Sequence, residues 1–255
     1  MTLWARIECD GRVCLAALAG ETLRLHDGDI FAPGVATGES VPAAEARWLT
    51  PVQPSKMVAL WNNFRASAEK NGWAIPAEPL HFIKTPNSFN AHGQPIRAPK
   101  SYSGRVAYEG ELGIVIGRTC TAVSVEEAPA HILGYTCVND VTAMELLQRD
   151  PSFPQWTRAK NFDGFGAFGP VVATGLDPAT LTVRTLVNGR ERQNYRADDM
   201  IFPPAELVSR ISQDMTLASG DVIACGTSLG VLPMKPGTTI EVAIDGIGTL
   251  RNEYV

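Results

Sequence analysis

Three acidic residues in two apolar stretches have the spacing to bind a hard divalent cation. Glu109 and Glu111 lie within residues 108–117, where β-branched residues and bounding glycines predict a buried strand. Residues i and i+2 of a strand point to the same face, so the two carboxylates should lie side by side. Asp140 lies in a second apolar segment, residues 134–141. Because three carboxylates with no nearby His or Cys pattern suit hard cations, they predict Mg²⁺ or Mn²⁺ rather than Zn²⁺.

A simpler interpretation of these acids must be weighed as well. A Glu-x-Glu pair is usually the solvated face of a strand, because carboxylates rarely lie inside a protein. Two carboxylates on one face of a buried strand, however, repel each other and are costly to desolvate unless a cation compensates them. The third acid therefore favours the metal site over the solvated strand.

The elements that position these residues are predicted to be mostly short strands. Residues 1–52 read as a small β domain, with strands at Trp4–Cys9, Val13–Leu18 and Thr22–Leu25 separated by glycine turns. Pro51 and Pro54 mark the passage to a second domain, residues 53–255.

Only a few short helices are predicted in the second domain. Ser124 and Glu127 have the spacing of a capping box that opens a helix, and Pro203 and Pro204 precede a helical pattern up to Ile211. Asn188-Gly189 predicts a hairpin turn. Many strands with few helices predict a β-rich α+β fold.

Composition excludes several classes of protein. The chain has 255 residues, of which 45% are hydrophobic and 19% charged, and its net charge is −5. No basic cluster indicates a nucleic-acid partner, and no apolar run approaches the roughly 20 residues that span a membrane. The five cysteines form no Cys-x-x-Cys motif, and residues 1–8 lack the pattern of a signal peptide. We therefore expect a cytoplasmic location.

Three motifs give the chain a specific resemblance to the fumarylacetoacetate hydrolase family. They are Tyr108–Leu112, Asn139–Ala143 and Gln155–Asp163, which match the family's Tyr-Glu-x-Glu-Leu, Asn-Asp-Val-Ser/Thr-Ala and Gln-Trp-x-x-x-Lys-x-Phe-Asp. The resemblance runs over roughly residues 55–252. It implies the family's mixed β-sandwich or roll, preceded here by the small N-terminal β domain.

The resemblance also implies the chemistry and the remaining site residues. Glu109, Glu111 and Asp140 would bind the cation, on which a small anionic 2-oxo acid chelates while its enolate forms. Lys160 matches the family's active-site lysine, which we expect to stabilise substrate or enolate charge rather than the fold. Lys84 resembles a second lysine on the substrate side. A solvated surface cation is the usual role of a single lysine, but both lie among apolar or aromatic residues.

Further residues are expected at the substrate. The glycine-rich segment 225–231 follows a strand, and the resemblance places Thr227 at the substrate, although a plain turn is the commoner meaning of such a segment. We expect specificity to depend on Phe64, Arg65, Met144 and the loop Val231–Lys235. A homodimer is expected as the working assembly.

The chain departs from the family where many of its hydrolases activate water. Those members carry Asn-Tyr-x-x-His-x-x-Glu, whereas Ser67 stands here at the His position, Lys70 at the Glu position, and Glu69 one place away. Met144 likewise replaces an arginine that usually follows the metal-binding Asp.

We expect hydrolysis of a C–C bond next to a 2-oxo acid, as in an acylpyruvate or a fumarylacetoacetate-like compound. Glu69, Glu145 or another residue of the lid segment around residues 63–72 would replace the base. Decarboxylation or hydroxymuconate-type isomerisation is the alternative, since both need the enolate but no activated water. A member that binds ligand without turnover is the third possibility, which the retained carboxylates and lysine disfavour.

Overall fold

The computed structural model describes all residues from 1 to 255. Its largest sheet has twelve strands and runs through the whole molecule. In chain order these are β1 (Leu3–Cys9), β2 (Arg12–Ala19), β3 (Thr22–Asp29), β4 (Ala32–Pro42), β5 (Arg47–Trp48), β6 (Met57–Trp61), β7 (Leu80–Lys84), β8 (Phe89–Asn90), β10 (Gly110–Ile116), β11 (Ile132–Asp140), β13 (Gly166–Ala173) and β16 (Val222–Ala224).

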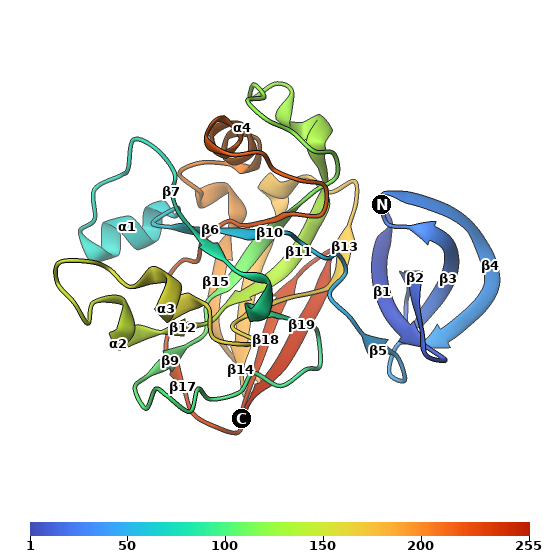
Figure 1. Ribbon diagram of the computed structural model, residues 1–255, viewed down its shortest axis with the longest axis horizontal. Coiled ribbons are helices and arrows are strands. Elements are labelled where there is room, and N and C mark those ends of the chain that lie inside the picture. Colours follow the sequence, from blue (N-terminus) through green and yellow to red (C-terminus); the bar gives the residue numbers. More distant parts are fainter.

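Two smaller sheets and a few short helices complete the fold (Figure 1). The three-stranded sheet contains β9 (Val106–Ala107), β12 (Thr142–Ala143) and β17 (Pro233–Met234), and the four-stranded sheet contains β14 (Thr182–Val187), β15 (Arg190–Arg196), β18 (Thr238–Ile244) and β19 (Gly248–Tyr254). The α-helices are α1 (Arg65–Asn71), α2 (Met144–Leu147), α3 (Trp156–Lys160) and α4 (Pro204–Asp214). The 3₁₀ turns are η1 (Pro86–Ser88), η2 (Ala128–His131), η3 (Pro178–Thr180) and η4 (Ala197–Asp199). This architecture confirms the predicted β-rich fold class.

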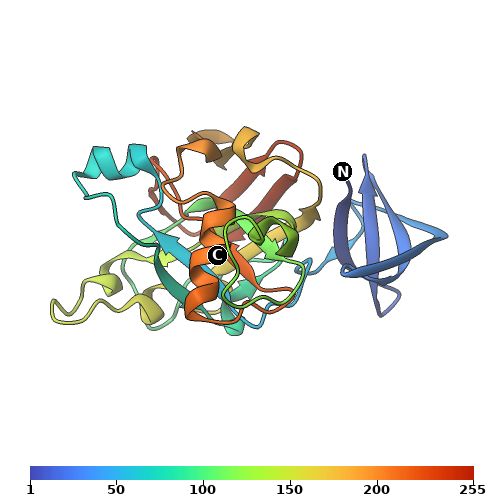
Figure 2. The same ribbon diagram turned by 90° about the horizontal axis from the view of Figure 1, so that it is seen from above.

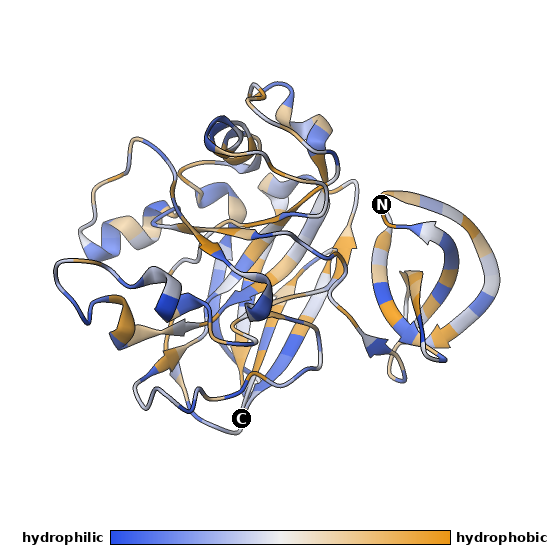
Figure 3. Ribbon diagram, viewed as in Figure 1, coloured by the Kyte–Doolittle hydropathy of each residue, from blue (hydrophilic) through white to orange (hydrophobic).

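The strands that carry the candidate metal ligands lie in the middle of the large sheet. β10 and β13 are buried along their whole length, as expected for strands covered on both faces. The four-stranded sheet covers one face, with β18 against β11 and β19 against β13. Figure 3 shows the hydrophobic residues that run along these central strands. The predicted buried strand at 108–117 is therefore present as β10.

The N-terminal strands form a lobe at one end of the molecule (Figure 2). β1 to β4 pair in chain order as an antiparallel meander, and β1 also pairs with β13, with Trp4 opposite Val172. The sequence prediction missed β4, because its eleven residues, rich in Gly and Pro, are almost all exposed and show no alternation of polar and apolar side chains.

Two of the three predicted helix starts and turns are present as expected, and the third differs. α4 begins at Pro204 as predicted, and Asn188-Gly189 joins β14 to β15 with positive φ at both residues. Ser124 and Glu127 exchange the two hydrogen bonds of a capping box, but the turn that follows is the 3₁₀ turn η2 rather than an α-helix. None of the helices has the length and hydrophobicity needed to cross a membrane.

Candidate functional site

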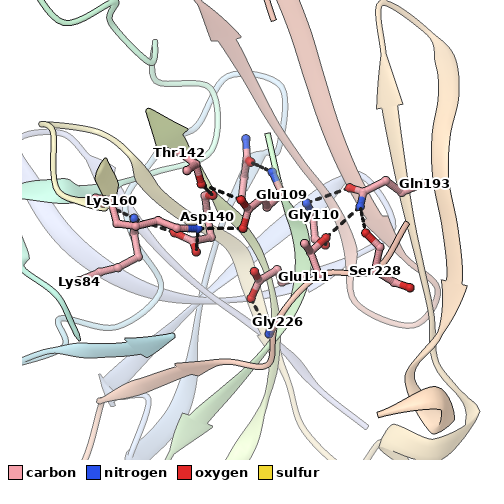
Figure 4. Close-up of polar contacts among 12 residues, drawn as sticks. Lys84, Glu109, Gly110, Glu111, Asp140, Thr142, Lys160, Gln193, Gly226 and Ser228 are labelled. Atoms are coloured by element: carbon pink, nitrogen blue, oxygen red, sulfur yellow. Dashed lines mark hydrogen bonds and ion pairs between the residues drawn. The ribbon is translucent and has the colours of Figure 1, made fainter. Parts of the chain in front are cut away.

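Three carboxylates meet where β10 begins and β11 ends (Figure 4). The antiparallel register places Gly110 opposite Asn139 and Glu111 opposite Val138, which brings Glu109 and Asp140 to the same end of the strand pair. One oxygen from each of the three acids lies within 4.8 Å of the others. Two of the acids are fully buried, and the Glu109 side chain is 18% exposed.

Backbone hydrogen bonds fix the two segments against each other. The Asp140 N–H donates to the Glu109 carbonyl at 2.9 Å, and the Glu109 N–H donates to the Asn139 Oδ1 at 3.1 Å. Between the two glutamates, Gly110 has no room for a side chain, because a Cβ there would lie 2.0 Å from the Thr185 Oγ1. The glycine in Glu-Gly-Glu is therefore required by packing.

Two lysines neutralise much of this acidic cluster. The Lys160 Nζ lies 2.8 Å from the Glu109 Oε2 and 2.5 Å from the Asp140 Oδ2. The Lys84 Nζ lies 2.8 Å from the Asp140 Oδ1 and also donates to the Lys160 carbonyl. Lys84 is completely buried and does not line the adjoining pocket. Its contacts indicate that it positions Asp140 and Lys160, rather than the substrate contact expected from the sequence.

Burial and charge shift the pKa values of the cluster in opposite directions. Burial, together with the charges of Asp140 and Glu109, raises the pKa of Glu111 well above its ordinary range. Burial acts the same way on Asp140, but Lys160 and Lys84 outweigh it and lower its pKa. Burial favours the neutral form of Lys160, yet its two acidic partners raise its pKa, so Lys160 carries a proton at neutral pH. Burial lowers the pKa of Lys84.

The residues present fit a hard divalent cation. The Glu111 Oε2 accepts a hydrogen bond from the Gly226 N–H at 2.8 Å, whereas its Oε1 is buried with no hydrogen-bond partner in the protein. A buried carboxylate oxygen without a donor is costly unless a cation contacts it. Oxygen ligands from three acids match Mg²⁺ or Mn²⁺, and they leave coordination positions for other oxygens. The identity of the metal ion, Mg²⁺ or Mn²⁺, stays a prediction.

A pocket of about 400 Å³ lies beside the cluster. Glu109, Thr142 and Lys160 line the end of the pocket next to the acidic cluster, together with Thr227 from the loop after β16. The Thr142 Oγ1 donates to the Glu109 Oε1 at 2.7 Å, a contact that no sequence motif indicated by itself. Of the three carboxylates, only Glu109 lines this pocket, while Glu111 and Asp140 are buried behind it.

Thr227 lies at the pocket, where the resemblance placed it. Its hydroxyl donates to the Gly110 carbonyl at 3.0 Å and accepts from the Gln193 Nε2 at 2.8 Å. Gln193 also accepts from the Gly110 N–H at 3.0 Å, so it ties the loop to the start of β10. Sequence reasoning missed Gln193, because an isolated glutamine in an exposed-looking strand carries no signal of its own.

The structure does not bring Arg65 or Glu69 to the pocket. Both are exposed on α1, whose Ser67 and Asn71 line the pocket instead. Residues four apart share a helix face, whereas Glu69 lies about 200° around the helix from Ser67. Phe64 does not line the pocket either, because it is buried against Tyr195.

Glu145, the other base considered, is also directed away from the pocket. Arg105 and Tyr102 hydrogen-bond its carboxylate, and these bonds lower its pKa to about 2. Such a carboxylate is a weak base, and it does not line the pocket. No carboxylate or imidazole other than Glu109 is among the lining residues.

Glu69→Gln should therefore leave turnover unchanged within about two-fold, since changes at exposed positions away from a site have small effects. Steady-state kinetics of the purified variant on any substrate of the wild type would measure this. A loss of ten-fold or more would return Glu69 to the mechanism.

Comparisons with known proteins agree with this geometry. A family model described as "Fumarylacetoacetate (FAA) hydrolase C-terminal" matches residues 56–255, and one described as "Rv2993c-like, N-terminal" matches residues 3–51. The chain is 38% identical to the oxaloacetate tautomerase YisK of Bacillus subtilis, over 79% of this chain and 70% of that protein.

Two further relatives carry different activities in their names. The chain is 33% identical to a 2,4-didehydro-3-deoxy-L-rhamnonate hydrolase of a Sphingomonas species, over 97% of this chain and 90% of the relative. A crystal structure described as 2-hydroxyhepta-2,4-diene-1,7-dioate isomerase from Mycobacterium marinum matches with a TM-score of 0.90 and 40% identity, covering 100% of this chain and 99% of that one.

Proposed function

The chain belongs to the fumarylacetoacetate hydrolase family, and we propose that it acts on a small 2-oxo acid by stabilising its enolate, as a divalent-cation-dependent decarboxylase or keto–enol isomerase. One observation supports this reaction type above the others. The pocket combines an acidic cluster and a protonated lysine with no side chain free to activate water. Decarboxylation suits such a pocket better than hydrolysis, because loss of CO₂ forms the enolate without a base. Keto–enol isomerisation would in addition move a proton from the carbon next to the 2-oxo group to its oxygen, and Glu109 is the one carboxylate lining the pocket that could accept it.

The charges of the cluster match a single anionic group. Three carboxylates and two ammonium groups leave one net negative charge, which a bound dication turns into one net positive charge. Glu109, Glu111 and Asp140 would hold the cation, which would supply electrophilic stabilisation as negative charge develops on the 2-oxo oxygen. One carboxylate of a bound 2-oxo acid would then neutralise the site, whereas the second carboxylate of a decarboxylase substrate such as oxaloacetate would leave as CO₂.

Lys160 would contribute a fixed positive charge at the edge of the pocket. Two of its three N–H donors are used by Glu109 and Asp140, which leaves one for the substrate. Because its acidic partners raise its pKa, Lys160 keeps its proton and donates a hydrogen bond to a developing enolate rather than acting as a base. Lys84 would hold Asp140 and the Lys160 backbone in place from the buried side.

Hydrolysis beside a 2-oxo acid is the second candidate, as first expected from the sequence. The relative named as a rhamnonate hydrolase favours it, because the two chains match over most of their length. Ser67 lines the pocket at the position of the family's histidine, but a hydroxyl has no basic nitrogen with which to accept a proton from water. Hydrolysis would thus need a base from outside the pocket described here.

A product screen with Mg²⁺ or Mn²⁺ distinguishes these reactions. We expect the wild type to release CO₂ from oxaloacetate, or to accelerate its keto–enol interconversion followed by ultraviolet absorbance, and to release no carboxylic acid from acetylpyruvate. EDTA should abolish the activity, and either cation should restore it. Rapid acetate release from acetylpyruvate with no enolate reaction would overturn the proposal in favour of hydrolysis.

A further inference from the structure

A line of four aromatic rings leads from Lys160 along one wall of the pocket. The Lys160 Nζ lies 5.1 Å from the centre of the Phe82 ring, and Phe82 stacks on Trp156 with centroids 4.8 Å apart. Trp156 is followed by Trp61 at 6.2 Å, and Trp61 by Trp73 at 5.0 Å. Trp73 is 40% exposed, so the line ends at the surface. The rings come from β6, β7, α3 and the segment after α1.

The other walls of the pocket are apolar or neutral. Met144 and Leu147 of α2 line it, with Leu229 and Val231 of the loop after β16. The polar residues away from the acidic cluster, such as Asn71, are uncharged. Lys160 is the only cation among the lining residues, and its charge is already shared with two carboxylates.

We propose that this pocket selects 2-oxo acids whose chain beyond the reacting carbons is apolar or aromatic, and discriminates against chains that end in a second carboxylate. The inference rests on the proposed function, because it assumes that the 2-oxo acid group binds at the carboxylate–lysine cluster. An apolar tail placed along the aromatic line is removed from water and contacts ring faces. A terminal carboxylate there would lose its hydration and meet no free cation.

Met144 is the residue that decides this selectivity most directly. It lies on α2 just after the strand β12 that carries Thr142, and it lines the pocket. A cationic side chain at this position would pair with a terminal carboxylate, whereas the thioether only contacts apolar groups.

A matched pair of ligands tests the proposal without turnover. Oxamate represents the 2-oxo acid group, N-butyloxamate adds an apolar tail, and N-(3-carboxypropyl)oxamate carries a carboxylate on a tail of similar length. Calorimetric titration of the full chain with Mn²⁺ present should show N-butyloxamate binding at least about ten-fold more tightly than the dicarboxylate.

Two variants and a control show which residues determine the preference between the two tails. Met144→Arg should reverse the preference between the two tails while changing the affinity for oxamate less than about three-fold. Trp73→Ala, at a partly exposed position, should weaken N-butyloxamate several-fold and leave oxamate unchanged. Val125→Arg places the same charge at an exposed site outside the pocket and should alter neither ratio.

The outcomes separate this inference from the proposed function. If oxamate binds only with the metal but the two tails bind equally, or the dicarboxylate binds more tightly, the selectivity is wrong and the enolate site stands. If oxamate does not bind with Mn²⁺ present, both are overturned. The expected ratio together with its reversal in Met144→Arg would establish the selectivity.

Discussion

Glu111→Gln should abolish Mn²⁺ binding and lower kcat/KM by more than about 10³-fold, because several kcal/mol of transition-state stabilisation depend on the bound cation. Glutamine keeps the size of the side chain but removes the charge of a fully buried ligand whose Oε1 has no other partner. Calorimetric titration with Mn²⁺ and steady-state kinetics would measure the two losses.

The thermal midpoint of Glu111→Gln shows whether the variant loses metal binding and activity without losing its fold. Burial raises the pKa of Glu111, which means that its charge destabilises the metal-free fold. In EDTA the variant should therefore melt at the wild-type temperature or above it. Glu253→Gln, at an exposed position of β19, serves as the matched control and should keep metal affinity and turnover. Unchanged Mn²⁺ affinity in Glu111→Gln would remove this residue from the metal site.

Lys160→Met should lower kcat/KM by roughly 10²–10³-fold, since a preorganised cation facing a developing enolate contributes a few kcal/mol. The sequence analysis expected Lys160 to act on the substrate rather than on the fold, whereas its buried ion pairs predict an effect on stability as well. Lys160 is 2% exposed and bridges Glu109 and Asp140, so the variant leaves two carboxylates without their shared partner. Breaking a buried ion pair in this way costs about 3–5 kcal/mol.

Metal-free Lys160→Met should accordingly melt well below the wild type, and Mn²⁺ should recover part of the difference by neutralising the same carboxylates. Differential scanning calorimetry with EDTA and with Mn²⁺ would measure the recovery. Lys100→Met, at an exposed position, is the control and should behave as wild type in both assays. Wild-type kinetics in Lys160→Met would exclude Lys160 from the mechanism.

The sequence predicted the parts of the site that depend on local geometry. Alternation along a strand is fixed by the backbone, so Glu109 and Glu111 could be placed on one face without knowing the fold. Asp140 was different, because only the register of β10 against β11 brings it to the glutamates, and no local pattern specifies that register. The assignment of Asp140 to the metal site came from the resemblance to the family.

The parts that were missed depend on how distant elements pack. Glu69 was expected to replace the hydrolytic base, but α1 places Ser67 in the pocket lining instead. The aromatic line joins Trp61 and Trp73 to Trp156, which lies far from both in the sequence and meets them only in the folded chain. Hydrolysis, the homodimer and the cytoplasmic location stay predictions.

The pairing of β1 with β13 gives the N-terminal lobe a protective role. It covers the backbone of residues 171–173 in a strand that is buried along its whole length and lies next to β11. A chain shortened to begin at residue 53 would expose these apolar residues with free N–H and C=O groups. Uncovered strands of this kind recruit further copies by edge-to-edge pairing. We therefore expect the lobe to protect this part of the ligand-bearing sheet from pairing with further copies, although it supplies no side chain to the pocket.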